Sequence, residues 1–246
     1  EVQEKVLAFL KERNGLSFQQ PLDLSSFSAM VFDFLERSVV GRRSIKIVVD
    51  RLGLRKSLTL GLPSKSGATL DEVAEKVGLT RERVRQLEAT ARTRARCGKA
   101  QMLLEPFKEK LATLMEEVGG VLSMDELSVQ VSSLMMWQMS VDGRAIANFL
   151  AFCLDGLSLQ GDALVGKHPC QQCVKVRSVL SDLVTHQARP TLRQATDAVR
   201  LFCVGRCNAD DRRLSKPSSG FIRHVADLSG LRVATTDAGV KYLLLK

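Results

Sequence analysis

The segment from Thr69 to Cys97 constrains the fold more than any other part of the 246-residue chain. Thr69 and Glu72 have the Thr-x-x-Glu spacing of a capping box, which satisfies two backbone donors at a helix start. Apolar residues then repeat at helical spacing as far as Gly78, and Thr80 supplies a second N-cap. The segment therefore predicts two helices joined by a tight turn, in the order that a helix-turn-helix requires.

The helix that Thr80 opens has two contrasting faces. Its inward stripe is expected to contain Val84, Leu87, Ala91 and Ala95. At about 100° per residue, the opposite face begins with Arg81, Glu82, Arg85 and Gln86. These side-chain types read base edges in a major groove, since Arg pairs with guanine, Gln with adenine and Glu with the cytosine amino group. The alternative is an arginine-rich helix that is merely solvated.

Thr80 to Glu88, TRERVRQLE, resembles the recognition helix of region 4 of bacterial primary sigma factors. The preceding TLDEVAEKVGL is similar to that family's preceding helix and turn, and Ser44 to Leu54 resembles its first helix. The resemblance implies that Arg81, Glu82, Arg85 and Gln86 contact promoter bases. It covers residues 44–97, and no other segment resembles the remaining sigma regions, so a complete sigma factor is not expected.

The charge distribution favours a polyanionic partner. The chain has 36 basic and 27 acidic residues, a formal net charge of +9, and seven basic against two acidic residues lie between Thr80 and Lys99. More than half of the net charge is thus on and just after the predicted recognition helix, which suits double-stranded DNA. The residues expected to contact DNA phosphates are Thr69, Thr80, Arg83, Arg92 and Arg96.

Periodicity and turn signals divide the chain into four segments and predict a mainly α fold. They are an N-terminal helical segment (1–40), the sigma region 4-like helix-turn-helix (41–99) and two winged-helix-like units (100–168 and 169–246). Each of the last two shows three helical stripes followed by a short β-hairpin wing. The third helix of the first winged-helix-like unit begins at Asp142, and its wing is LSLQGDALVGK, which turns at Gly161 and Asp162.

Winged-helix units bind DNA in some proteins and dock proteins in others. The helix from Asp142 to Leu154 carries only Arg144 as a cation, which favours protein docking. In the second winged-helix-like unit, a phosphate contact is a further possibility, because several cations lie near its third helix. They are Arg212, Arg213, Lys216 and Arg223.

The six cysteines predict thiols rather than disulfides, because no secretory signal is visible. Cys170, Cys173, Cys203 and Cys207 are weak candidates for a zinc site. The spacing of the last two is helical, so small buried hydrophobes are the favoured interpretation and no metal is expected.

No motif of an enzyme is present: the sequence lacks a phosphate-cradling glycine loop, a nucleophile elbow and a paired acidic nuclease motif. We expect no cofactor and no catalytic activity. No apolar run is long enough for a membrane span, and a soluble, cytoplasmic protein is expected.

The leading hypothesis is sequence-specific binding of double-stranded DNA through the helix after Thr80, in transcription-related regulation. RNA polymerase or another protein is a further candidate partner, through the winged-helix units. The alternative is a DNA-binding or protein-docking module at the C-terminal end of a large multidomain protein. That alternative follows from a weaker resemblance, in the order of units, to the tails of large kinase-type proteins of bacterial phage defence.

Overall fold

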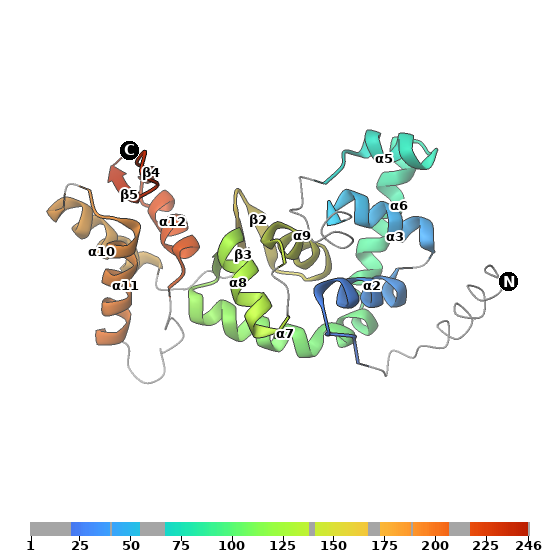
Figure 1. Ribbon diagram of the computed structural model, residues 1–246, viewed down its shortest axis with the longest axis horizontal. Coiled ribbons are helices and arrows are strands. Elements are labelled where there is room, and N and C mark those ends of the chain that lie inside the picture. Colours follow the sequence, from blue (N-terminus) through green and yellow to red (C-terminus); the bar gives the residue numbers. More distant parts are fainter. Residues whose placement is uncertain are drawn as a thin grey trace. The chain divides into compact units, whose positions relative to one another are not determined.

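The computed structural model describes residues 21–39, 41–54, 67–137, 141–166, 173–187, 189–206 and 217–245. Their contacts form two compact units (Figure 1). The first unit contains residues up to Lys108 together with Met135–Asp155. The second contains Glu109–Leu134 together with the chain from Gly156 onward.

The described chain is mainly helical with two small antiparallel sheets, in agreement with the predicted class. The helices of the first unit are α2 (Phe27–Ser38), α3 (Arg42–Arg51), α5 (Leu70–Val77), α6 (Arg81–Ala95) and α9 (Gly143–Cys153). α7 (Gly98–Val118) contributes to both units. The helices of the second unit are α8 (Met124–Leu134), α10 (Cys173–His186), α11 (Leu192–Arg206) and α12 (Ser219–Leu228). None of the helices in the described ranges is long and apolar enough to cross a membrane.

The predicted helix-turn-helix is present as α5, a turn and α6. The capping box at the start of α5 is complete, because Thr69 and Glu72 each accept a hydrogen bond from the other's backbone N–H. Gly78 ends α5 with φ of +64°, a conformation that glycine adopts without steric cost. Thr80 then caps α6 by accepting from Arg83 N at 3.2 Å.

A small apolar cluster holds α3, α5 and α6 together. Its buried members are Ile47, Val73, Ala74 and Val84, with Leu87 and several other partly buried side chains packed around them. The core side of α6 is thus the one predicted from periodicity, which leaves the opposite side to solvent.

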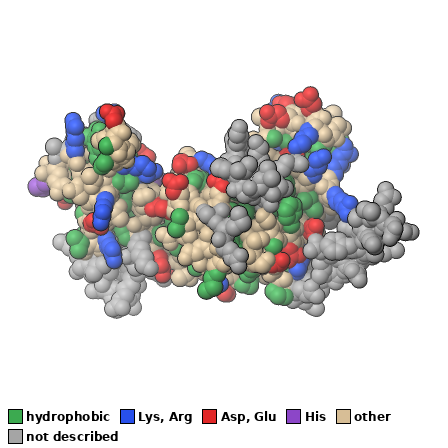
Figure 2. All heavy atoms as spheres, in the orientation of Figure 1, with side chains coloured by type: hydrophobic (Ala, Val, Ile, Leu, Met, Phe, Trp, Pro, Cys, Tyr) green, Lys and Arg blue, Asp and Glu red, His purple; other side chains and the backbone are tan. Residues whose placement is uncertain are grey.

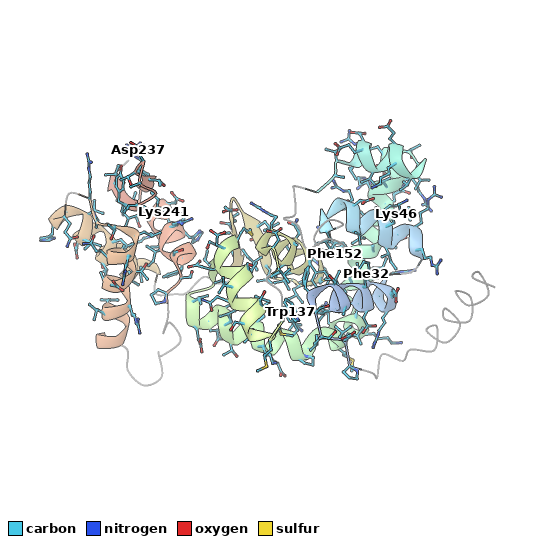
Figure 3. All side chains as sticks on the ribbon, viewed as in Figure 1. Phe32, Lys46, Trp137, Phe152, Asp237 and Lys241 are labelled. Carbon is cyan, nitrogen blue, oxygen red and sulfur yellow. The ribbon has the colours of Figure 1, made fainter. Side chains whose placement is uncertain are left out.

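Aromatic packing joins α9 to α2 in the first unit. The buried Phe149 ring meets the Phe27 and Phe34 rings edge to face, with centroids 6.0 and 5.7 Å apart. Trp137, which is labelled in Figure 3, packs on Phe27 and donates from Nε1 to the carbonyl of Leu24. These units group the elements differently from the four predicted segments, because α9 buries its aromatic residues among helices far away in sequence.

A three-stranded sheet lies in the second unit. Its strands are β1 (Val121–Ser123), β2 (Leu157–Gln160) and β3 (Ala163–Gly166), in the order β1-β3-β2. The predicted hairpin is confirmed as β2 and β3, in antiparallel register with Gln160 opposite Ala163 and a turn at Gly161 with φ of +57°. β1 was not predicted as a strand, since three residues are too few to show alternation.

The last section has three helices followed by a second hairpin, β4 (Leu231–Thr235) with β5 (Lys241–Leu245). Thr191 and Gln194 form a capping box at the start of α11, and Thr191 also bridges to Tyr242 of β5. A shared core of α10, α11, α12 and both hairpin strands buries, among others, Leu180, Val199, Phe221 and Leu243. The order of helices and hairpin agrees with the predicted order in both sections.

The start of α12 packs closely on β1 and α8. Glu126 of α8 accepts from Ser123 N and Oγ in its own capping box, and also from Ser219 N and Gly220 N. A Cβ at Gly220 would lie 2.5 Å from Ser123 N, so only glycine fits there. One carboxylate therefore caps two helices that lie more than ninety residues apart in sequence.

Candidate nucleic-acid interface

The first two turns of α6 present a polar face to solvent. Arg81, Glu82, Arg85 and Gln86 are all exposed, whereas Val84 between them is fully buried. On the face drawn in Figure 2, Lys and Arg side chains gather over α3, α5 and α6, beside acidic side chains. The structure therefore brings together, on one exposed face, the four side chains that the sequence assigns to base contacts.

Glu82 is the centre of a hydrogen-bonded cluster on this face. Its carboxylate accepts two hydrogen bonds from Arg85, at 2.8 and 2.7 Å, and one from Gln86 at 3.3 Å. The hydrogen bonds from Arg85 hold the pKa of Glu82 below its usual value and raise the pKa of Arg85. Both groups are thus charged near neutral pH, and the pairing holds the Arg85 fork in one orientation.

Arg81 and Arg83 flank this cluster. Arg81 Nη1 lies 3.7 Å from a carboxylate oxygen of Asp71 on α5, across the turn, and both side chains are about 70% exposed. Arg83 donates to Gln86 Oε1 at 3.2 Å. Exposed contacts of this kind contribute little to stability, so both arginines can exchange their partners at small cost.

Two ion pairs brace the helix-turn-helix beneath the exposed face. Arg51 of α3 donates to Glu88 of α6 at 2.7 Å, and Lys76 of α5 lies 3.0 Å from the buried carboxylate of Asp50. Sequence reasoning missed both pairs. Nothing in the sequence around Glu88 indicates an ion pair, because its partner Arg51 lies 37 residues earlier.

The comparison with known families agrees with this geometry. Residues 52–96 match the family described as sigma-70, region 4. The segment is a DNA-binding type of helix-turn-helix, and the match confirms the resemblance seen in TRERVRQLE. It covers less than half of the chain. Searches of curated proteins and of solved structures found no match, and the weaker resemblance to phage-defence proteins has no support among these findings.

The two threonine caps of the region 4 helix-turn-helix differ in what they leave available for a phosphate. Thr69 Oγ1 donates to the Glu72 carboxylate and accepts from its N–H, so its hydroxyl is already used within the capping box. Thr80 Oγ1 accepts from Arg83 N, and its hydroxyl hydrogen has no acceptor among the described residues. Of the two hydroxyls, that of Thr80 is the one with a hydrogen still available for another acceptor.

Arg92 and Arg96, at the end of the region 4 recognition helix, are held by other parts of the first unit. Arg96 donates to the carbonyls of Ala151 and Phe152 and pairs with Asp155 at 2.6 Å. These bonds occupy the guanidinium with the C-terminal end of α9, so we reassign Arg96 from phosphate contact to a structural role. Arg92 stacks over Phe152, with 5.6 Å from its guanidinium carbon to the ring centroid, and stays half exposed.

The zinc candidates fall mostly outside the described residues. Cys170 and Cys207 lie there, while Cys173 and Cys203 are in α10 and α11 but their side chains are not described. Within the described ranges, no group of three or more His, Cys, Asp and Glu side chains could hold a metal ion. The buried Cys153 is a free thiol whose pKa burial raises well above 9.0, so it behaves as a small hydrophobe.

Proposed function

We propose that this protein binds double-stranded DNA sequence-specifically, with α6 in the major groove, in a transcription-related role. The observation that carries the proposal is the exposed face of α6, where Arg81, Glu82, Arg85 and Gln86 lie beside one another above a buried apolar stripe. Arg85 and Gln86 are of the types that read guanine and adenine. The proposed role is binding rather than catalysis.

Phosphate contacts on either side of the groove complete the proposed interface. Thr80 and Arg83 stand at the start of α6, where the positive end of the helix dipole also favours an anion. Arg92 lies three turns further along, on the half-exposed side. Arg96 is left out because α9 already binds its guanidinium.

Arg85→Ala should lose discrimination between sites, by about 1–3 kcal/mol for the base that Arg85 contacts. Selection of bound duplexes from a random library, repeated with Arg85→Ala, measures this directly. Arg94→Ala is the matched control, because Arg94 is an exposed cation on the same helix. It lies outside the group of Arg81, Glu82, Arg85 and Gln86. It should weaken binding to all sequences alike, if at all. Equal selectivity of Arg85→Ala and the unmodified protein would refute the proposed readout.

A second role is supported for the part of the chain from α7 onward. We propose that its two sections of three helices and a hairpin, α7 to β3 and α10 to β5, are winged-helix-like and dock protein, either RNA polymerase or other domains of a larger protein. The third helices, α9 and α12, are largely buried by protein, as their residues Phe149, Phe152, Phe221 and Ile222 show. A buried third helix is not free to enter a groove, so this burial favours docking over DNA reading. Co-purification of polymerase subunits at low salt tests the first partner.

A further inference from the structure

A pocket of about 450 Å³ lies in the second unit, beside α12. Its walls come from the polar side of α12, from the turn between β2 and β3, and from β1 at Ser123. The volume is within the range of small-ligand sites. The polar side chains that line it are Ser123, Gln160, Asp162, Arg223, His224 and Asp227.

Arg223 is the least satisfied group in this pocket. Its Nε is buried and has no hydrogen-bond partner, and no described residue forms an ion pair with its guanidinium. His224, the next residue of α12, also has no partner in the described part of the chain. Burying this one N–H donor without an acceptor costs free energy, which an acceptor in the pocket would recover.

The chemistry of the walls points to an oxyanion. A guanidinium offers a planar fork of donors that matches two oxygens of a phosphate, and His224 and Gln160 add further donors. The Ser123 hydroxyl is not available, because it donates to Glu126. Asp162 and Asp227 also line the pocket, but each has interactions of its own. Their charges weaken the attraction for an anion without supplying a partner for Arg223.

We propose that this pocket binds a phosphate group, with Arg223 and His224 as its ligands. The group belongs either to a free phosphate compound or to a DNA backbone. The site is in the second unit and does not depend on the base-reading face of α6.

Titration calorimetry of the whole chain with inorganic phosphate tests the site, with chloride at matched ionic strength as the reference. Arg223→Gln should weaken phosphate binding by about tenfold or more, because it removes a charge-assisted hydrogen bond. Arg232→Gln, at an exposed arginine of β4 in the same unit, should leave binding unchanged. Asp227→Asn should strengthen binding, because it removes a like charge from the pocket wall.

The sign of the Asp227→Asn effect keeps the test decisive even if Arg223→Gln fails to fold. Unchanged or weaker phosphate binding by Asp227→Asn would overturn the proposal, as would equal losses in the Arg223 and Arg232 variants. Arg85→Ala should bind phosphate normally, so failure here is distinct from failure of DNA reading by α6.

The salt dependence of duplex binding separates the two sources of phosphate. If a DNA backbone occupies the pocket, Arg223→Gln should reduce the slope of log affinity against log salt by about one, and Arg232→Gln should not. An unchanged slope, together with lost binding of inorganic phosphate, assigns the pocket to a free phosphate compound. If Arg223→Gln changes neither the salt slope nor the binding of inorganic phosphate, the proposal is overturned.

Discussion

Phe149→Ala is expected to lower the free energy of unfolding of the first unit by about 3–5 kcal/mol, the range for a phenylalanine lost from a packed core. Phe149 is fully buried, and its ring makes edge-to-face contacts with Phe27 and Phe34. The substitution would remove both contacts and leave a cavity between α2 and α9. Urea unfolding followed by tryptophan fluorescence measures the loss, since Trp137 is the one tryptophan of the chain and lies in this unit.

Phe32→Ala is the matched control for this prediction. Phe32 is on the same helix as Phe27 but is 38% exposed, so its loss should cost about 1 kcal/mol or less. Equal effects of Phe32→Ala and Phe149→Ala would contradict the packing of α9 within the first unit. Arg92 of α6 and Arg96, which follows the helix, both contact the end of α9, so α6 is also expected to depend on this packing.

Glu126→Ala should destabilise the second unit by about 2–4 kcal/mol, because two helix caps are lost together and the donors left behind are partly buried. The carboxylate accepts from Ser219 N at 2.5 Å and from Gly220 N at 3.1 Å, in addition to its own capping box. Hydrogen exchange at the amides of α8 and the start of α12 should rise in the variant. Those of α5 and α6 should not change.

Asp125→Ala provides the control for Glu126→Ala. Asp125 is an exposed acid in the first turn of α8, so its removal tests the charge without the caps. A loss well under 1 kcal/mol is expected, from the helix dipole alone. Were the two variants equally stable, the shared cap would not be a stabilising contact.

The same carboxylate makes stability depend on pH. Burial would raise the pKa of Glu126, but hydrogen bonds from Ser123, Ser219 and Gly220 outweigh it and hold the pKa below 4.5. A lowered folded pKa means that the contribution is complete above the unfolded value and is lost as pH falls through the folded one. Stability of the second unit should therefore decline below about pH 4.5, and Glu126→Gln should remove this part of the decline. Urea midpoints measured across this range check it.

Much of the local structure could be predicted from the sequence. The capping boxes at Thr69 and Thr191, the stop at Gly78 and the turn at Gly161 all involve residues within a few positions of one another. Short-range signals of this kind fix where helices and hairpins begin and end. The polar face of α6 could be predicted for the same reason, because helical periodicity alone places Arg81 and Arg85 opposite Val84.

Contacts between distant parts of the chain could not be predicted in this way. Arg96 was expected to contact phosphate, because a surface arginine after a recognition helix has no local partner. Its acceptors, the carbonyls of Ala151 and Phe152, lie 55 and 56 residues later. The brace between Arg51 and Glu88 was missed for the same reason.

The sequence by itself determined the helix-turn-helix and the four side chains of its exposed face, since both follow from periodicity, caps and a family pattern within residues 69–97. Only the tertiary structure decided that α9 joins the first unit, that Glu126 caps α12, and that Arg223 lines a pocket without a partner among the described residues. The physical reason is that aromatic burial and hydrogen bonds depend on which surfaces meet in space. Local spacing along the chain does not encode that.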